Sequence, residues 1–184
     1  MRKSVNLMRT STIIVAQPLF PYSMTEIARI LDQFRRAYNG DAWYGSPVTE
    51  ILRGISSEQA ARRIIPQAHS IWELLLHITA WEGEALRRLE TGVMDMPEEG
   101  DWNVVADSSE ASWGNAMQRF HTVHTALEQK IENLADEELQ TVLGTKRVRE
   151  TGEGVSVYVL LHGIIQHTIY HAGQIALLKK ALES

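Results

Sequence analysis

The chain has 184 residues, a length that fits one domain of ordinary size. Its 44% hydrophobic and 22% charged residues exclude a disordered chain and are typical of a globular protein. The net charge of −5 argues against a nucleic-acid partner, because proteins that bind DNA or RNA usually present a basic face. The chain has no cysteine, so disulfide-stapled secreted modules, thiolate metal sites and cysteine nucleophiles are excluded.

The first residues do not have the pattern of a signal peptide. The apolar run Ile13-Ile14-Val15-Ala16 is shorter than the roughly 7–15 residues that a signal peptide needs. We interpret residues 1–22 as a poorly ordered or extended arm and 23–184 as a single domain, and either Met1 or Met24 can be the true start. No stretch approaches the roughly 20 apolar residues of a membrane span, so we expect a cytoplasmic protein with no membrane partner.

Four long segments carry apolar residues at spacings of three and four, which predicts four long helices. Ser70, followed by Glu73 three residues later, has the pattern of a capping box at the start of the second helix. Thr91-Gly92 ends that helix. The four predicted helices span about 23–38, 70–90, 109–134 and 156–182.

The connections between these helices differ in length and composition. Short helices are predicted after Pro47 and Ser56, residues 92–108 form a polar connecting loop, and residues 136–138 begin a short extra turn. Residues 141–155 are rich in β-branched residues and glycine, which predicts an extended loop or hairpin before the last helix. The predicted fold is all-α: a four-helix bundle with at least one crossover connection.

Three histidines suggest a metal site. His167 and His171 are one helical turn apart and differ by only about 40° around the helix, so both rings can face one ion. His77 lies mid-helix beside an apolar stripe, where an unsatisfied ring nitrogen would cost roughly 1–3 kcal/mol. From the pattern alone, a shared divalent ion and ordinary hydrogen-bonded packing are both open.

The other histidines are expected elsewhere. His121 and His124 form a rival pair, but Phe120 and Val123 take the core face of that helix, so we expect both histidines to be exposed to solvent. His162 is about 140° from His167 around its helix and should point away from it, and His69 is a loop residue.

Two segments together resemble the DinB-like superfamily, which includes the YfiT-type proteins described as metal-dependent hydrolases. They are residues 70–82, SIWELLLHITAWE, and residues 161–175, LHGIIQHTIYHAGQI, and the resemblance extends over about 24–182. It implies a homodimeric four-helix bundle with crossover topology, with a nickel, zinc or iron ion on His77, His167 and His171. Some relatives transfer low-molecular-weight thiols such as bacillithiol, and others use mycothiol, as in maleylpyruvate isomerisation.

Three protein nitrogens leave coordination positions open, as in catalytic metal sites. An ion in such a site can lower the pKa of bound water or bind and activate an external thiolate. Three residues are candidates to line a pocket beside the site. Gln174 lies within about 20° of His167 on the helical wheel and could reach a ligand or substrate. Gly163 would leave room for a substrate, and Trp81 could line one side of the pocket. Ordinary packing is equally compatible with these three positions.

No catalytic acid or base is assigned by the sequence. Glu84 shares the helix face of His77 and is a weak candidate for a general base, although an exposed ion pair with Arg87 or Arg88 fits better. Tyr170, between the two histidines of the last helix, either packs on them or donates through its hydroxyl. Gln174 is the third weak candidate.

The leading functional hypothesis is a metal-dependent thiol transferase or hydrolase acting on a small-molecule substrate. The alternative is a non-catalytic, metal-stabilised dimeric stress or interaction protein whose bundle faces bind a partner. A third hypothesis is a retained scaffold with a vestigial site. The sequence specifies neither the substrate nor the physiological metal.

Overall fold

A computed structural model describes residues 24–144 and 155–183, so the predicted arm at residues 1–22 lies outside the described part of the chain. Within those ranges no helix is at once long enough and apolar enough to cross a bilayer. The elements are α1 (Glu26–Tyr38), α2 (Val48–Leu52), α3 (Ser57–Ala61), α4 (Ile71–Thr91), α5 (Glu110–Glu132), the 3-10 helix η1 (Asp136–Gln140), β1 (Val142–Leu143), β2 (Val155–Ser156) and α6 (Val157–Glu183).

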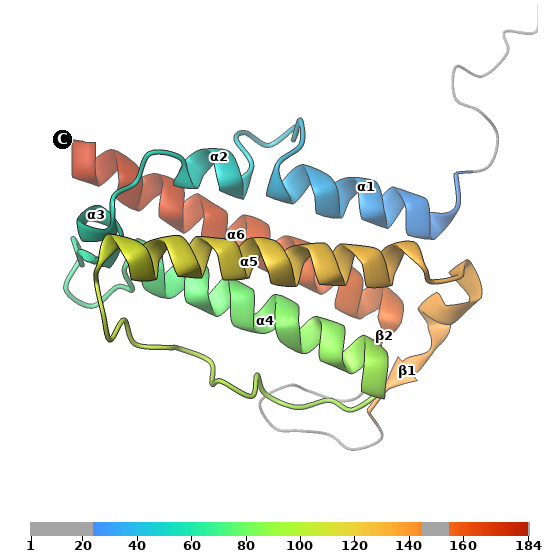
Figure 1. Ribbon diagram of the computed structural model, residues 1–184. Helices are drawn as coiled ribbons and strands as arrows, with labels where there is room; N and C mark the ends of the chain where they lie inside the picture. The colour runs from blue at the N-terminus through green and yellow to red at the C-terminus, as the bar shows by residue number, and fades with distance from the viewer. Residues whose placement is uncertain (1–23, 145–154, 184) are drawn as a thin grey trace, which may run out of the picture.

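The long helices α1, α4, α5 and α6 form the bundle, which confirms the predicted all-α fold (Figure 1). α4 and α5 run in the same direction, and α1 and α6 run in the opposite one. Trp72 and Trp113, near the starts of α4 and α5, accordingly lie together with ring centroids 5.0 Å apart. The connection at 92–109 therefore has to return along the length of the bundle, and it is the predicted crossover.

Local sequence explains where the helices begin and end. The Ser70 side chain accepts a hydrogen bond from the Glu73 backbone N–H, and the Glu73 carboxylate accepts one from the Ser70 N–H, so the predicted capping box is formed. Gly92 ends α4 with φ of 71°, a left-handed conformation that favours glycine. β1 and β2 pair antiparallel, as expected for an extended segment before α6, and residues 145–154 lie outside the described part.

Two apolar clusters fill the two ends of the bundle, and buried polar side chains lie between them. Along α5, His124 lies between Phe120 of one cluster and Leu127 of the other. Along α6, Thr168 falls in the same way between Ile165 and Ala172. We call these buried polar residues the central polar layer: His77 and Glu82 on α4, His124 on α5, and Thr168 and His171 on α6.

His124 is buried, so the expectation that it is exposed to solvent was wrong. Its ring is stacked between those of Phe34 and Tyr38, at centroid distances of 4.2 and 3.8 Å. Its Nδ1 donates to the Glu82 carboxylate at 3.1 Å. The physical reason is that His124 lies one turn beyond Phe120 and only about 40° around the helix, on the core side.

His121 is exposed, as expected, and its Nδ1 hydrogen-bonds the Tyr38 hydroxyl at 2.8 Å. Glu82 has no exposed surface and accepts a second hydrogen bond, from the Thr168 hydroxyl at 3.3 Å. Glu82, His124 and Thr168 therefore link α4, α5 and α6 through polar contacts at the middle of the bundle.

The buried contact between His124 and Glu82 should contribute strongly to stability. We expect His124→Ala to lower the free energy of unfolding by about 3 kcal/mol, because it leaves a buried carboxylate without its partner and opens a gap between two aromatic rings. His121→Ala on the same helix is the matched control and should cost less than about 1 kcal/mol. Urea denaturation measures both values, and equal losses would contradict the assignment.

Candidate metal centre

Three histidines from two helices converge at the middle of the bundle. His77 of α4 and His167 and His171 of α6 each offer one ring nitrogen, and these atoms all lie within 4.8 Å of one another. The Nε2 atoms of His77 and His167 are 2.9 Å apart. Two nitrogens at that separation, each about 2.0–2.1 Å from a common ion, would subtend about 90° at the ion. The cluster can therefore hold one metal ion.

His77 is oriented by the connection between α4 and α5. Its Nδ1 lies 2.7 Å from the backbone oxygen of Asp101, and a carbonyl oxygen can only accept, so Nδ1 carries the hydrogen. The lone pair is then on Nε2, which faces the other two histidines. The Asp101 carboxylate lies 3.3 Å from the same Nδ1 and accepts a hydrogen bond from Trp81 Nε1. Such a partner fixes the tautomer of a metal-binding histidine.

Trp102 covers His77 and completes this side of the site. Its ring is stacked on that of His77 with centroids 3.9 Å apart, and His69 is stacked on its other face at 3.6 Å. The sequence predicts only a polar loop for the segment that contains Asp101 and Trp102, and neither residue was predicted to lie at the site. The tryptophan in this connection was the signal available.

His171 has its own orienting partner. Its Nδ1 donates to the side-chain oxygen of Gln174 at 3.0 Å, so its Nε2 also presents a lone pair. Gln174 was expected to line a pocket or reach a ligand. The structure places it instead against the outer nitrogen of one of the three histidines.

The electrostatic environment keeps all three rings neutral. Burial, followed by the neighbouring imidazoles of His171 and His77, lowers the pKa of His167 to about 3. Burial also lowers the pKa of His77 and of His171 below the usual value. Neutral imidazole is the form that binds metal ions, so at pH 7 the cluster needs no deprotonation before it can accept one.

His167 lies beside a small cavity between α4 and α6. Trp81 and Gly163, which the sequence analysis placed beside the site, both line this cavity of about 240 Å³ together with His167. The Trp81 ring centroid is 6.3 Å from that of His77 and 6.1 Å from that of His167. The cavity therefore adjoins the histidine cluster directly.

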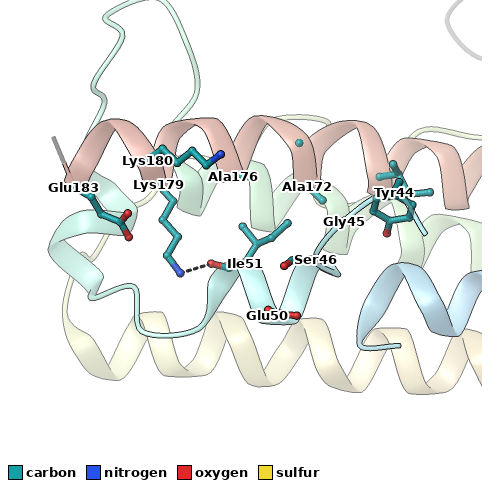
Figure 2. Close-up of a pocket in the computed structure, with 12 residues that line it drawn as sticks. Tyr44, Gly45, Ser46, Glu50, Ile51, Ala172, Ala176, Lys179, Lys180 and Glu183 are labelled. Atoms are coloured by element: carbon teal, nitrogen blue, oxygen red, sulfur yellow. Dashed lines mark hydrogen bonds between the residues drawn. The ribbon is translucent and has the colours of Figure 1, made fainter. Parts of the chain in front are cut away.

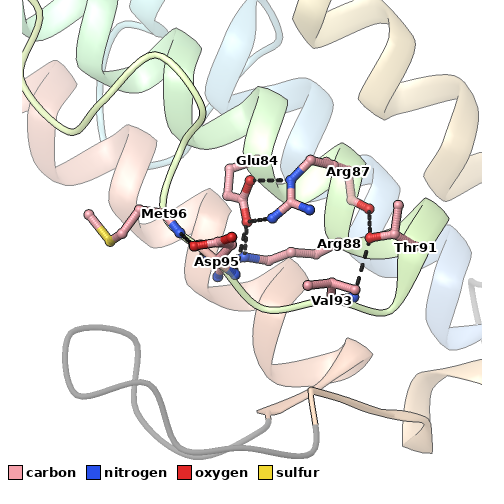
Figure 3. A network of polar contacts seen from close by, with 7 residues as sticks. All are labelled: Glu84, Arg87, Arg88, Thr91, Val93, Asp95 and Met96. Carbon is pink, nitrogen blue, oxygen red and sulfur yellow. Dashed lines mark hydrogen bonds and ion pairs between the residues drawn. The ribbon is translucent and has the colours of Figure 1, made fainter.

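Glu84 is engaged away from the three histidines. Its carboxylate accepts hydrogen bonds from Arg87 and Arg88 and from the backbone N–H of Asp95, as Figure 3 shows. The ion pairs were expected, but Glu84 is buried and not exposed. A carboxylate held by two guanidinium groups is poorly suited to act as a general base. Tyr170 is 65% exposed, and its ring packs edge-on against His171.

A larger cavity, about 710 Å³ in volume, lies between α6 and the segment that contains α2 (Figure 2). Tyr44, Ile51 and Ala176 are among its lining residues, whereas none of the three clustered histidines is. At one end, Lys179 Nζ donates to the backbone oxygens of Ile51 and Arg53, both at 2.8 Å. This cavity has no ligand set comparable to that of the histidine cluster.

The remaining histidine of α6, His162, lies outside the cluster. Its ring packs against that of Tyr158 with centroids 4.4 Å apart. The expectation that it points away from His167 therefore agrees with its position.

The lowered pKa values predict how the metal-free protein responds to acid. A histidine whose pKa is lower in the folded state stabilises the fold above about pH 6.5, and this contribution is lost as the pH falls towards 3. We expect the free energy of unfolding of chelator-treated protein to decrease over this window, by at most about 1.4 kcal/mol per pH unit for each histidine. In His167→Gln the free energy of unfolding should fall less between pH 7 and pH 5 than in wild type. In His121→Gln it should fall as much as in wild type. Denaturation of each protein at pH 7 and at pH 5 measures the difference. Identical slopes in all three proteins would contradict the electrostatic account.

Comparisons with known proteins agree with this fold. The family model of the DinB superfamily matches residues 46–175. The crystal structure of YjoA, a DinB-like protein from Bacillus subtilis, is similar with a TM-score of 0.61 and 16% sequence identity, over 85% of this chain and 93% of that chain. No curated protein matches the sequence. The family match spans well over half of the chain and includes all three clustered histidines, and the chain therefore belongs to the DinB superfamily.

Proposed function

We propose that this protein is a metal-dependent enzyme that holds one divalent transition-metal ion on His77, His167 and His171. The observation that carries the proposal is the convergence of three neutral ring nitrogens within 4.8 Å. Imidazole is a suitable ligand for zinc, nickel and iron, so the ligand set is compatible with each of these metals. Asp101 and Gln174 support the proposal because each holds the outer nitrogen of a ligand histidine and leaves the inner one free.

The number of protein ligands favours a catalytic over a purely structural site. Structural zinc sites are usually closed by four protein ligands, whereas catalytic ones have three and keep a position for water or substrate. The bound ion would supply a Lewis acid that activates water or an external thiol at that position. The cavity beside His167 gives a substrate room next to the cluster.

The residues around the cluster would orient the ligands and limit the access of water. Trp102 covers one face of His77, and Trp81 lines the adjoining cavity together with His167. Hydrolysis and transfer of a low-molecular-weight thiol both need an activated nucleophile, and the chain has no cysteine of its own to provide one. We therefore propose these two reaction classes. The homodimer, the cytoplasmic location and the non-catalytic alternative stay predictions.

Metal content tests the proposal. Protein purified without a metal-affinity step should contain about one equivalent of nickel, zinc or iron per chain, because three neutral imidazoles face one point. His167→Ala should lose this metal, and His162→Ala, on the same helix but outside the cluster, should retain it. Elemental analysis by mass spectrometry measures the content.

Activity and stability then separate a catalytic ion from a structural one. If the ion is catalytic, His167→Ala should abolish turnover of ester, amide or thiol-transfer substrates while thermal stability falls only modestly. If the ion is structural, His167→Ala should instead collapse thermal stability. A metal-replete wild type that is inert towards these substrates would favour the non-catalytic alternative. Full metal retention by His167→Ala would contradict the proposed site.

A further inference from the structure

We infer that the substrate of this centre carries an apolar group, about the size of a phenyl ring or a short acyl chain, that binds in the cavity beside His167. The polar reacting group of the substrate would then lie at the three histidines. We call this cavity the side cavity; its lining includes Trp81, Ala85, Met94, Leu160, Gly163 and His167. The inference rests on the proposed function, since it assigns a substrate class to the same centre.

The lining of the side cavity is apolar apart from Arg88 and His167. The polar atom of Trp81 is already used, because Nε1 donates to the Asp101 carboxylate. Arg88 donates to Glu84 and to the backbone oxygen of Asp95, and its guanidinium lies 5.3 Å from the centroid of the Trp81 ring. A polar group bound there would give up water without finding equivalent partners, so the side cavity favours an apolar one.

The volume of the side cavity limits the size of the apolar group that it can bind. This volume is about 240 Å³. An apolar protein cavity of about 150 Å³ is large enough to bind benzene. A phenyl ring or a short branched or linear acyl chain therefore fits, whereas a sugar or a nucleotide would meet the wrong surface chemistry.

One substrate can occupy the histidine cluster and the side cavity together. His167 belongs to both, because its Nε2 faces His77 while its ring lines the side cavity. Gly163 lies one turn before His167 on α6, and a Cβ added there would meet no atom within 4 Å. A Cβ at Gly163 therefore meets no steric obstacle, and a larger side chain there would occupy space next to His167. Gly163 is thus a specificity-determining position.

Two hydroxamic acids test the inference on the zinc-loaded full-length protein. Acetohydroxamic and benzohydroxamic acid bind zinc through the same atoms and differ in carrying a methyl or a phenyl group. Isothermal titration calorimetry should show benzohydroxamic acid binding about tenfold tighter or more, because its ring is buried in the side cavity. Gly163→Leu should reduce this ratio to about one.

Gly173→Leu is the matched control, because Gly173 is also an exposed glycine of α6 but lines the larger cavity near α2. This variant should keep the preference of the wild type for the phenyl compound. Equal affinities of the two acids for wild type, or an unchanged preference in Gly163→Leu, would overturn the inference and leave the metal centre standing. Failure to load zinc, or binding of neither acid, would overturn the proposed function and the inference with it.

Discussion

The convergence of three imidazoles, two buried and one half-buried, at the middle of the bundle is the feature around which the rest of the site is arranged. His77 and His171 each have a hydrogen on the outer nitrogen, because that nitrogen donates to an oxygen. Burial keeps the rings neutral, so their inner nitrogens present electron density to a common point. A cation at that point could accept the inner nitrogens of His77 and His171 together with that of His167, in place of the 2.9 Å contact between the Nε2 atoms of His77 and His167, and would offset the cost of burying these polar groups.

The topology of the bundle makes this arrangement possible. α4 and α5 run parallel, so the chain must return along the bundle between them (Figure 1). That return segment contains Asp101 and Trp102, which contact His77 through a hydrogen bond and a stacked ring. The central polar layer occupies the same level, where the two apolar clusters at the ends of the bundle meet. Glu82, His124 and Thr168 stabilise the packing of three helices next to the ligands without belonging to the cluster.

Much of this could be predicted from local pattern. The capping box at Ser70 and the apolar periodicity predicted the bounds of the long helices within a few residues. The four-residue spacing of His167 and His171 predicted that both rings lie on one side of α6. Asp101 and Trp102 could not be found in this way, because their position depends on a long connection with no period of its own. His124 was misassigned because a helix face is wide, and a residue at its edge is buried or exposed according to which helix packs against it.

The proposed function requires that three imidazoles from two helices bind one ion. X-ray absorption spectroscopy of the zinc-reconstituted protein tests it most directly, because the signal reports the number and distance of the ligand atoms. We expect three imidazole nitrogens at about 2.0–2.1 Å together with one to three further ligands that are not histidines, and the loss of one imidazole in His77→Ala. A spectrum with a single imidazole or none, unchanged by that substitution, would contradict it.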